Sequence, residues 1–356
     1  MFTIEGIAAF IFILGVLVFF HELGHFLVAR KTGVKALKFS LGFGPKIIGK
    51  KVGDTEYLLS AIPLGGYVKL LGEEPGEELS PEERVFSFSD QPVWKRAAIV
   101  AAGPIFNMIL AFLIFSVIFS FGVPVIKSQI GDVQKDSPAE KAGLMKDDTI
   151  IAIDGKEIAQ WEEIKVDIEK KKGEELEFTI DRHGSQIILN ITPELKSSKN
   201  IFGEDKETWM IGILPKGSYF TKRYNPVTSL YLGFKRTIEI TGLTIVGIIK
   251  LIEGVIPTST IGGPILIAQI AQQQTEQGLL NVLLFVAILS INLGILNLLP
   301  IPILDGGHLL FFAIEAIMGK PLSIKKREIA QQVGLFLLIL LMIFAFYNDI
   351  MRIFTG

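Results

Sequence analysis

The sequence contains no cysteine. This absence excludes a disulfide framework, thiolate metal ligands and a cysteine nucleophile, and it leaves the redox compartment open. An excess of charge of one sign is also missing, because 35 basic residues stand against 37 acidic ones. The composition therefore shows no electrostatic footprint of a nucleic-acid-binding protein, and we expect no nucleic-acid partner.

Hydrophobic residues, by contrast, are plentiful. They occupy 49% of the 356 positions and the mean hydropathy is positive, which is more than a soluble domain usually carries. A run of about 20 apolar residues is long enough to cross the hydrocarbon core of a bilayer. Four runs are therefore predicted to be membrane-spanning helices: residues 4–29, 97–121, 279–303 and 333–346.

The flanking charges predict how these helices are oriented. No basic region precedes the first run and Glu5 lies near its start, so we interpret it as a retained helix rather than a signal peptide. Two basic clusters should be cytoplasmic by the positive-inside rule, which leaves the N-terminus and residues 122–278 outside. The clusters comprise Arg30, Lys31, Lys35, Lys38, Lys46, Lys50, Lys51, Lys69, Lys95 and Arg96, and then Lys320, Lys325, Lys326 and Arg327.

A fifth apolar stretch, residues 230–252, differs from the four runs. It carries Lys235, Arg236 and Glu239 near its middle, and ionised groups are costly at the centre of a bilayer. We therefore expect an interfacial or protein-packed helix instead of a span. A span here would also put Asp305 on the opposite side of the membrane from the histidines of the first run.

Residues 128–192 have the pattern of a soluble α/β module. Ser137 to Glu140 forms a capping box with proline at the first helical position, and Gly143 is placed to end that short helix. A strand over 149–153, a turn at Asp154 and Gly155, a helix over 161–172 and two further strands, 176–180 and 186–191, are predicted to follow. His183, between the last two strands, is expected to be a surface residue.

The main chemical signal is His21-Glu22-Leu23-Gly24-His25 in the first apolar run. At 3.6 residues per turn the two histidines share one face of a helix and can reach one metal ion. Glu22 is offset beside them, where it can act as a base on water. Two of only four histidines fall in this spacing, and ionisable groups are expensive inside a membrane. A functional zinc site is therefore favoured over a chance motif.

The depth and the third ligand of this site can also be predicted. His21 lies about 25 Å along the helix from Ile4, close to the cytoplasmic edge of a core about 30 Å thick. A catalytic zinc uses three protein ligands and one open position. Asp305 is the best candidate for the third ligand, because Pro300 and Pro302 disrupt the third spanning helix just before it. His308 is a rival candidate. The alternative for His308 is a histidine that is only hydrogen-bonded after the turn and binds no metal.

These motifs together resemble one family. His21 to His25, the stretch from Asn297 to His308, the segment Ala102–Asn107 (AGPIFN) and a module similar to a PDZ domain are all typical of bacterial site-2 proteases of the regulator-of-sigma-E type, within the M50 family of intramembrane zinc metalloproteases. The resemblance runs nearly from end to end. It implies Zn²⁺ bound by His21, His25 and Asp305, with Glu22 as the catalytic base.

The resemblance further implies substrate-binding residues. Asn297 is expected to bind substrate or to stabilise the oxyanion, although a helix-packing amide is an equal alternative from the residues alone. Residues 35–71 resemble a membrane-associated β element whose edge can pair with an unwound substrate through Gly65, Gly66 and Tyr67; the alternative is a cytoplasmic hairpin that contacts no substrate. Asn107 carries no catalytic prediction.

The expected architecture is a membrane α-helical protein with about four transmembrane helices, a cytosol-facing membrane-associated β element and one extracytoplasmic α/β PDZ domain. The tandem PDZ domains of well-known relatives do not fit here, so this single domain is expected to bind a peptide or only to exclude bulky substrates. The expected segments are a helix with the HExxH motif (1–31), the β region (32–95), a second span (96–122), the PDZ domain (123–195), an extracytoplasmic or interfacial region (196–278), a third span with the Leu-Asp-Gly motif (279–312), a cytoplasmic connection (313–328) and a fourth span (329–356).

The resemblance implies an endopeptidase of the bacterial inner membrane that cuts in or near the transmembrane segments of pre-trimmed single-pass proteins. Anti-sigma factors and remnant signal peptides are the expected substrate classes, in regulated intramembrane proteolysis. Two rival functions have weaker support. A peptide-binding adaptor would have no use for Glu22 beside two metal ligands, and a metal transporter would need polar residues along the second and fourth helices, which are mostly apolar.

Overall fold

The computed structural model describes residues 3–74 and 77–355, apart from the side chains of Leu64 and Thr355. The outermost residues of the first and last expected segments, and residues 75–76 of the β region, lie outside this description. The chain divides into two compact units, each treated by itself below. The helical unit comprises Met1–Ile118, Val227–Ile249 and Pro257–Gly356, and the strand-rich unit comprises Phe119–Pro226 and Lys250–Ile256.

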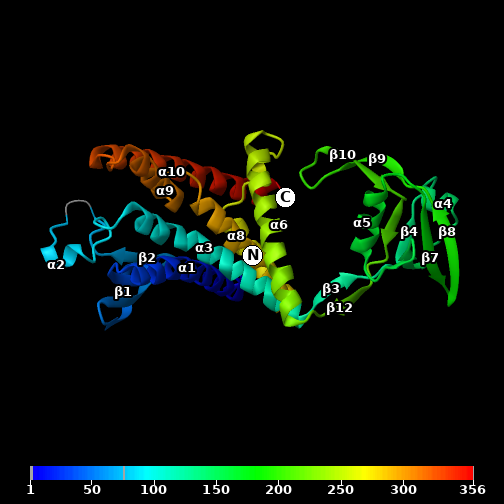
Figure 1. The fold of residues 1–356 in the computed structure, drawn as a ribbon, viewed down its shortest axis with the longest axis horizontal. Helices are drawn as coiled ribbons and strands as arrows, with labels where there is room; N and C mark the ends of the chain where they lie inside the picture. The colour runs from blue at the N-terminus through cyan, green and yellow to red at the C-terminus, as the bar shows by residue number, and fades with distance from the viewer. Residues whose placement is uncertain (1–2, 75–76, 356) are drawn as a thin grey trace. The chain divides into compact units, whose positions relative to one another are not determined.

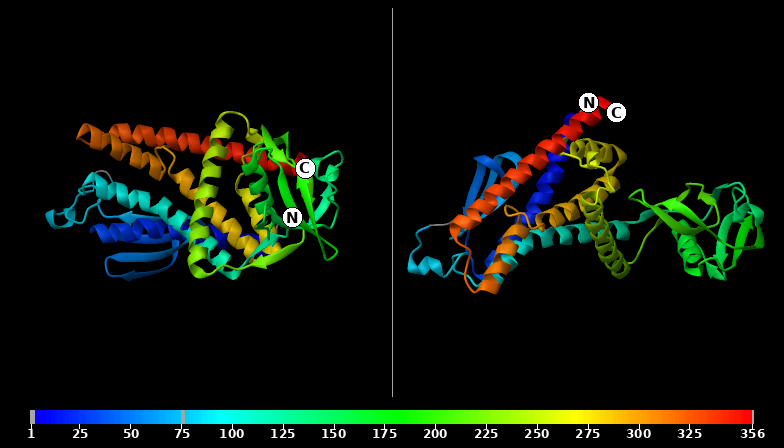
Figure 2. Two further views of the ribbon diagram at one scale, coloured as in Figure 1. Left: turned by 45° about the vertical axis from the view of Figure 1, so that its right-hand side comes forward. Right: turned by 90° about the horizontal axis from the view of Figure 1, so that it is seen from above.

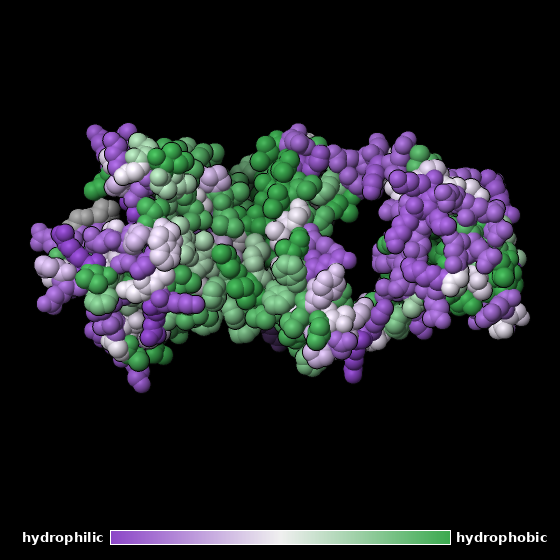
Figure 3. Space-filling model, in the orientation of Figure 1, coloured by the Kyte–Doolittle hydropathy of each residue, from purple (hydrophilic) through white to green (hydrophobic). Residues whose placement is uncertain are grey.

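Within the described residues, four helices are long and apolar enough to cross a membrane, as predicted. In Figure 3 hydrophobic residues cover much of the surface of the helical unit, as lipid-facing helices require. The first two helices lie within four residues of the expected bounds, whereas the third ends earlier, at Asn297, and the fourth is longer than 333–346 at both ends. The four are α1 (Ile4–Thr32), α3 (Val93–Phe121), α8 (Leu279–Asn297) and α10 (Ile324–Thr355).

Helices α1 and α3 meet at a point where neither has room for a side chain. A Cβ atom on Gly24 of α1 would lie 2.3 Å from the carbonyl oxygen of Ala102 on α3. The backbones can approach this closely because Gly24 has no side chain, which is a common device where membrane helices pack. The turn of α1 that carries His21 and His25 is thereby held against α3.

The stretch with central charges forms α6 (Pro226–Ile252), which is not among the four candidate spans in the described chain. One face of α6 packs on α3, where a Cβ on Gly233 would lie 2.2 Å from Oγ of Ser116. This contact agrees with the expected protein-packed helix. A further helix, α7 (Pro264–Gln277), falls in the region 196–278, which was expected only to be extracytoplasmic or interfacial.

The predicted β region consists of two long strands, β1 (Ala36–Val52) and β2 (Thr55–Leu70), followed by the short helix α2 (Pro81–Arg84). Residues 38–41 pair with 66–69 on one side and with 56–59 on the other, so the two strands fold into a small sheet. Figure 2 shows this sheet beside α1, and Phe39 packs there against Phe26. Among the described residues, segment 66–70 pairs only with β1 and forms an edge of the sheet.

The strand-rich unit is built around a four-stranded sheet in the order β6-β5-β7-β8. Figure 1 labels two of its strands, β7 and β8. Its buried core includes Ile130, Ile150, Trp161, Phe178 and Ile211. The elements are β3 (Val123–Ile126), β4 (Ile130–Val133), α4 (Pro138–Lys141), β5 (Thr149–Ile153), β6 (Lys156–Glu157), α5 (Trp161–Lys171), β7 (Leu176–Arg182), β8 (Ser185–Ile191), β9 (Glu194–Lys199), β10 (Asp205–Met210), β11 (Ile213–Pro215) and β12 (Tyr219–Lys222).

The local signals in this unit are found where the sequence placed them. Ser137 caps α4 by accepting a hydrogen bond from the backbone N–H of Glu140 at 3.2 Å. His183 and Gly184 both have positive φ and close the β7–β8 hairpin, as a two-residue turn requires. His183 is exposed, as expected.

The boundary of the unit, however, lies beyond the expected 123–195. Strand β11 pairs with β4, and Ile211 is 1% exposed in the core. The chain therefore returns after residue 195 to complete the unit. A short strand whose partner lies some 80 positions earlier leaves no periodic signal in the local sequence, which explains the misplaced boundary.

A buried ion pair makes the stability of the strand-rich unit testable. Asp148, 1% exposed, accepts hydrogen bonds from Arg182 at 2.8 and 2.7 Å. We expect Arg182→Met to lower the local free energy of unfolding by about 3 kcal/mol, because Asp148 would keep a buried charge without its partner. The measurement is hydrogen exchange of the β5 and β7 amides in the full-length protein.

The matched control is Lys156→Met, which removes an exposed partner of Asp167. Exposed pairs contribute little, so its effect should stay within about 1 kcal/mol. Unchanged protection in Arg182→Met would show that the Asp148 pair does not stabilise the unit.

Candidate metal centre

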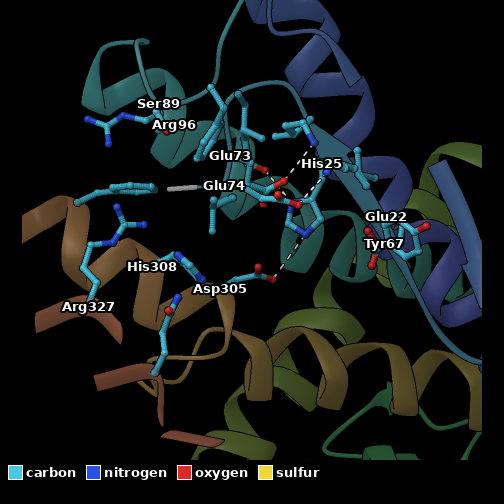
Figure 4. A pocket seen from close by; sticks show the side chains of 18 of the residues that line it. Glu22, His25, Tyr67, Glu73, Glu74, Ser89, Arg96, Asp305, His308 and Arg327 are labelled. Atoms are coloured by element: carbon cyan, nitrogen blue, oxygen red, sulfur yellow. Dashed lines mark hydrogen bonds and ion pairs between the residues drawn. The ribbon is translucent and has the colours of Figure 1, made fainter. Parts of the chain in front are cut away.

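Three predicted side chains converge inside the helical unit. The Nε2 atoms of His21 and His25, one turn apart on α1, lie 3.2 Å from each other. Oδ2 of Asp305 lies 3.2 Å from Nε2 of His21 and 3.7 Å from Nε2 of His25. Figure 4 shows Asp305 pointing toward His25 across the pocket.

Asp305 reaches this position because the third spanning segment is broken. Instead of the single expected span over 279–312, α8 ends at Asn297 and a new helix, α9 (Asp305–Met318), begins at the aspartate. A Cβ on Gly306 or Gly307 would lie 2.2 Å from the carbonyl oxygen of Leu298 or Ile301. A side chain at either position would collide with this backbone, so only glycine permits the tight turn. The predicted disruption of the helix before Asp305 is therefore present, and the two glycines after Asp305 make the turn possible.

The donor set fits a zinc ion. Each of the three residues can offer one ligand atom, and these atoms lie within 4.8 Å of one another. Oδ2 of Asp305 is buried and, within the described residues, has no hydrogen-bond partner. Two imidazole nitrogens and one carboxylate oxygen are a ligand set typical of catalytic zinc, with one coordination position left open. A cation at this point would satisfy the carboxylate oxygen.

Two cavities border the cluster, and together they contain every other predicted site residue. The larger, of about 620 Å³, is lined by Glu22 and Tyr67 as well as by the three clustered residues. The smaller, of about 380 Å³, is lined by Glu22, Gly65, Gly66 and Asn297, and by His21 and Asp305. The edge segment of the sheet and the end of α8 therefore border the same site.

The rival ligand His308 lies in the wall of the larger cavity, one turn after Asp305 on α9. It does not belong to the group of converging ligand atoms found among the described residues. The geometry therefore favours Asp305 over His308 as the third ligand.

The wall of the larger cavity also contains charged residues that the sequence did not predict as part of the site, among them Glu73 and Arg96. Glu73 accepts a hydrogen bond from the backbone N–H of Leu70 at 3.1 Å, and burial raises the pKa of its carboxyl. Arg96 forms a two-pronged ion pair with Glu315, with N–O distances of 2.6 and 3.2 Å. This pair ties α9 to the start of α3, so it helps to hold the helix that carries Asp305.

Gly103 was part of a quoted motif but received no role from the sequence. A Cβ atom there would lie 2.3 Å from Nε2 of His25 and 2.9 Å from Cε1 of His21. The imidazoles consequently pack directly against the backbone of α3. A glycine in the middle of an apolar helical run is the only sequence signal that could have indicated this contact.

Comparison with known proteins agrees with this geometry. The model of peptidase family M50 matches residues 9–341. The chain belongs to peptidase family M50. It is 39% identical to a protein of Agrobacterium fabrum named "Putative zinc metalloprotease Atu1380", over 97% of this chain and 95% of the relative. It is also 32% identical to "Protease RseP" of Yersinia pestis, over 98% of this chain and 99% of the relative.

These similarities establish the class of enzyme. The chain is a zinc metalloprotease, and four helices in its described part are suited to crossing a membrane. The expected relationship to regulator-of-sigma-E proteases is confirmed by a third relative, "Regulator of sigma-E protease RseP" of Salmonella typhimurium, at 33% identity over 98% of this chain and 99% of the relative.

The contact of Gly103 with the histidines can be tested by substitution. We expect Gly103→Ala to weaken zinc binding at least about 10-fold, because the added methyl group must displace the imidazoles. The measurement is competition for zinc between the purified protein and a chelator. Gly15→Ala on α1 is the control, since within the described chain its Cβ would meet no atom within 4 Å. Equal zinc affinities for Gly103→Ala and the control would contradict this packing.

Proposed function

We propose that the protein is an intramembrane endopeptidase that hydrolyses peptide bonds in or near the transmembrane segments of single-pass membrane proteins. One observation carries the proposal: the cluster of His21, His25 and Asp305 lies between membrane-suited helices, next to both a carboxylate and an exposed sheet edge. A soluble protease needs no such burial of polar groups among apolar helices. The substrates are proteins already trimmed outside the membrane, such as anti-sigma factors or remnant signal peptides, in regulated proteolysis.

In this proposal, His21, His25 and Asp305 hold the zinc ion of the family. Bound there, zinc supplies Lewis-acid chemistry for peptide hydrolysis. Glu22 lines both cavities that border the three ligands, so it can meet water and substrate together. Its carboxylate takes a proton from the attacking water and delivers it to the leaving amine.

Asn297 is the proposed hydrogen-bond donor in this chemistry. It is the last residue of α8 and lines the smaller cavity with Glu22 and Asp305. A carboxamide N–H can donate a hydrogen bond to the oxygen that becomes negative as the peptide carbonyl is attacked. Asn297 lies at the end of a helix and lines the cavity beside the site. This position favours the role of an oxyanion donor over that of an amide that packs helices.

The edge of the sheet is the proposed binding surface for the unwound substrate. Gly65 and Gly66 line the smaller cavity. A Cβ atom on Gly65 would lie 2.2 Å from the ring of Phe43, and one on Gly66 would lie 2.7 Å from the carbonyl oxygen of Ser40, so glycine lets this segment pack closely on β1. Tyr67 stacks on Phe43 with nearly parallel rings, which holds the edge in place. A substrate strand added here would have its backbone hydrogen bonds satisfied while its scissile carbonyl faces Glu22.

The strand-rich unit is proposed to be a single PDZ domain outside the membrane. The match with the relative from Yersinia pestis extends over 451 positions, whereas this chain has 356 residues, so that relative contains residues absent here. One domain in place of a tandem pair would bind a peptide weakly or exclude bulky substrates. The protein would then lie in the inner membrane of a bacterium, with the N-terminus and this unit outside and the zinc site near the cytoplasmic face.

The role of Glu22 is tested by Glu22→Gln. We expect cleavage of a model transmembrane peptide to fall by at least about 100-fold, because the amide cannot accept the proton from water. Bound zinc should remain, since Glu22 is not among the converging ligand atoms. Peptide cleavage and zinc content are measured in the same detergent preparations.

Glu73→Gln is the matched control, because it makes the same change in the wall of the larger cavity and should keep cleavage. Removing zinc from the wild type with a chelator should abolish cleavage, and adding zinc back should restore it. Equal cleavage by Glu22→Gln and wild type would exclude Glu22 as the base.

The role of Asn297 predicts a loss of turnover without a loss of zinc. We expect Asn297→Ala to lower kcat by about 100-fold, because the developing oxyanion loses a hydrogen-bond donor. Asn292→Ala is the control: it lies on the same helix but bonds to Thr244 at 3.0 Å. Peptide kinetics and zinc content distinguish the two variants, and an unchanged kcat in Asn297→Ala would rule out the oxyanion role.

A further inference from the structure

The amide of Asn107 on α3 has an unexplained position against the metal centre. The residue is 0% exposed, and its Nδ2 atom lies 3.2 Å from Nδ1 of His21. Its Oδ1 atom is buried and, in the part of the chain that the structure describes, lacks a hydrogen-bond partner. The backbone is fixed, because Ser290 on α8 donates a hydrogen bond to the carbonyl oxygen of Asn107 at 2.7 Å. A buried polar atom left without a partner calls for a physical explanation.

His25 shows what a metal-ready imidazole needs. Its Nδ1 atom lies 2.9 Å from the backbone carbonyl oxygen of Ile99. A carbonyl can only accept, so Nδ1 of His25 carries the proton and donates it. The neutral ring then has a lone pair on Nε2, which faces the cluster, and this is the form in which histidine binds a metal.

His21 is held differently. The NH2 end of an amide can only donate, so its contact with Nδ1 places the proton of the neutral ring on Nε2. From there Nε2–H can donate to Nε2 of His25, 3.2 Å away. The same tautomer blocks Nε2 of His21 as a metal ligand.

We infer that Asn107 sets the tautomer of His21 and is a positioning residue for zinc. Half a turn of its side-chain amide exchanges Oδ1 and Nδ2, which have nearly the same size and shape. Oδ1 then accepts the Nδ1–H of His21, and the lone pair on Nε2 is opened to the metal. The unpartnered Oδ1 is the acceptor that this second state uses. The inference rests on the proposed zinc ligation by His21.

Zinc affinity tests this role with two opposite substitutions. Asn107→Leu keeps the approximate size but removes the acceptor, so we expect zinc to bind 10- to 100-fold more weakly, the usual effect of losing a partner that orients a metal-bound histidine. Asn107→Asp can only accept, so it should bind zinc at least as tightly as the wild type. Asn292→Leu is the control, because the amide there bonds to Thr244 and not to a histidine. Affinity is measured by chelator competition on full-length protein in detergent.

A spectroscopic readout tests the proton position directly. The chain has four histidines, so ¹⁵N spectra of histidine-labelled protein can be assigned with single substitutions. We expect the proton of His21 to be on Nε2 without zinc and on Nδ1 with zinc, while His25 keeps its proton on Nδ1 in both states. This measurement uses the wild type and does not depend on whether a variant folds.

The outcomes separate this inference from the proposed function. Two results would overturn the role of Asn107 and leave the zinc site standing. One is that the wild type binds zinc while Nδ1 of His21 is unprotonated. The other is that wild type and Asn107→Leu bind zinc with equal affinity. Looser binding by Asn107→Asp than by Asn107→Leu would show that the amide acts as a donor, which also overturns it. Failure of the wild type to bind zinc overturns both the zinc site and this inference.

Discussion

The close contact between α1 and α3 is the constraint on which the site depends. Gly24 allows the two backbones to meet, and Gly103 leaves room for the imidazoles of His21 and His25 directly against α3. Polar side chains inside an apolar helix bundle need partners, because no water competes for them there. Helix α3 supplies those partners through the carbonyl of Ile99 and the amide of Asn107. The same packing therefore buries the histidines and orients them.

The break in the third span has a complementary role. A continuous helix would bury its backbone N–H and C=O groups in its own hydrogen bonds and could not turn back toward α1. Residues 298–304 interrupt the helix, and the return of Gly306 and Gly307 against this segment aims Asp305 at the two histidines. The ion pair between Arg96 and Glu315 fastens the far half of α9 to α3. One helix thus positions both the histidines and the element that carries their acidic partner.

Local patterns made much of this structure predictable, and long-range contacts did not. The spacing of His21 and His25, the prolines before Asp305 and the cap at Ser137 each act within a few residues, so the sequence displays them directly. The return of β11 to β4 and the contact of Asn107 with His21 join segments far apart in the chain. Nothing near Asn107 in the sequence distinguishes an amide that packs helices from one that orients a ligand. Only the fold supplies that difference.

The two histidines consequently differ in how freely they can change. His25 is tied to a backbone carbonyl, whose direction is fixed by the helix, so its tautomer is set before any metal arrives. His21 is tied to a side-chain amide that can present either end. An amide that can turn can match either tautomer of His21, whereas the carbonyl of Ile99 holds His25 in one.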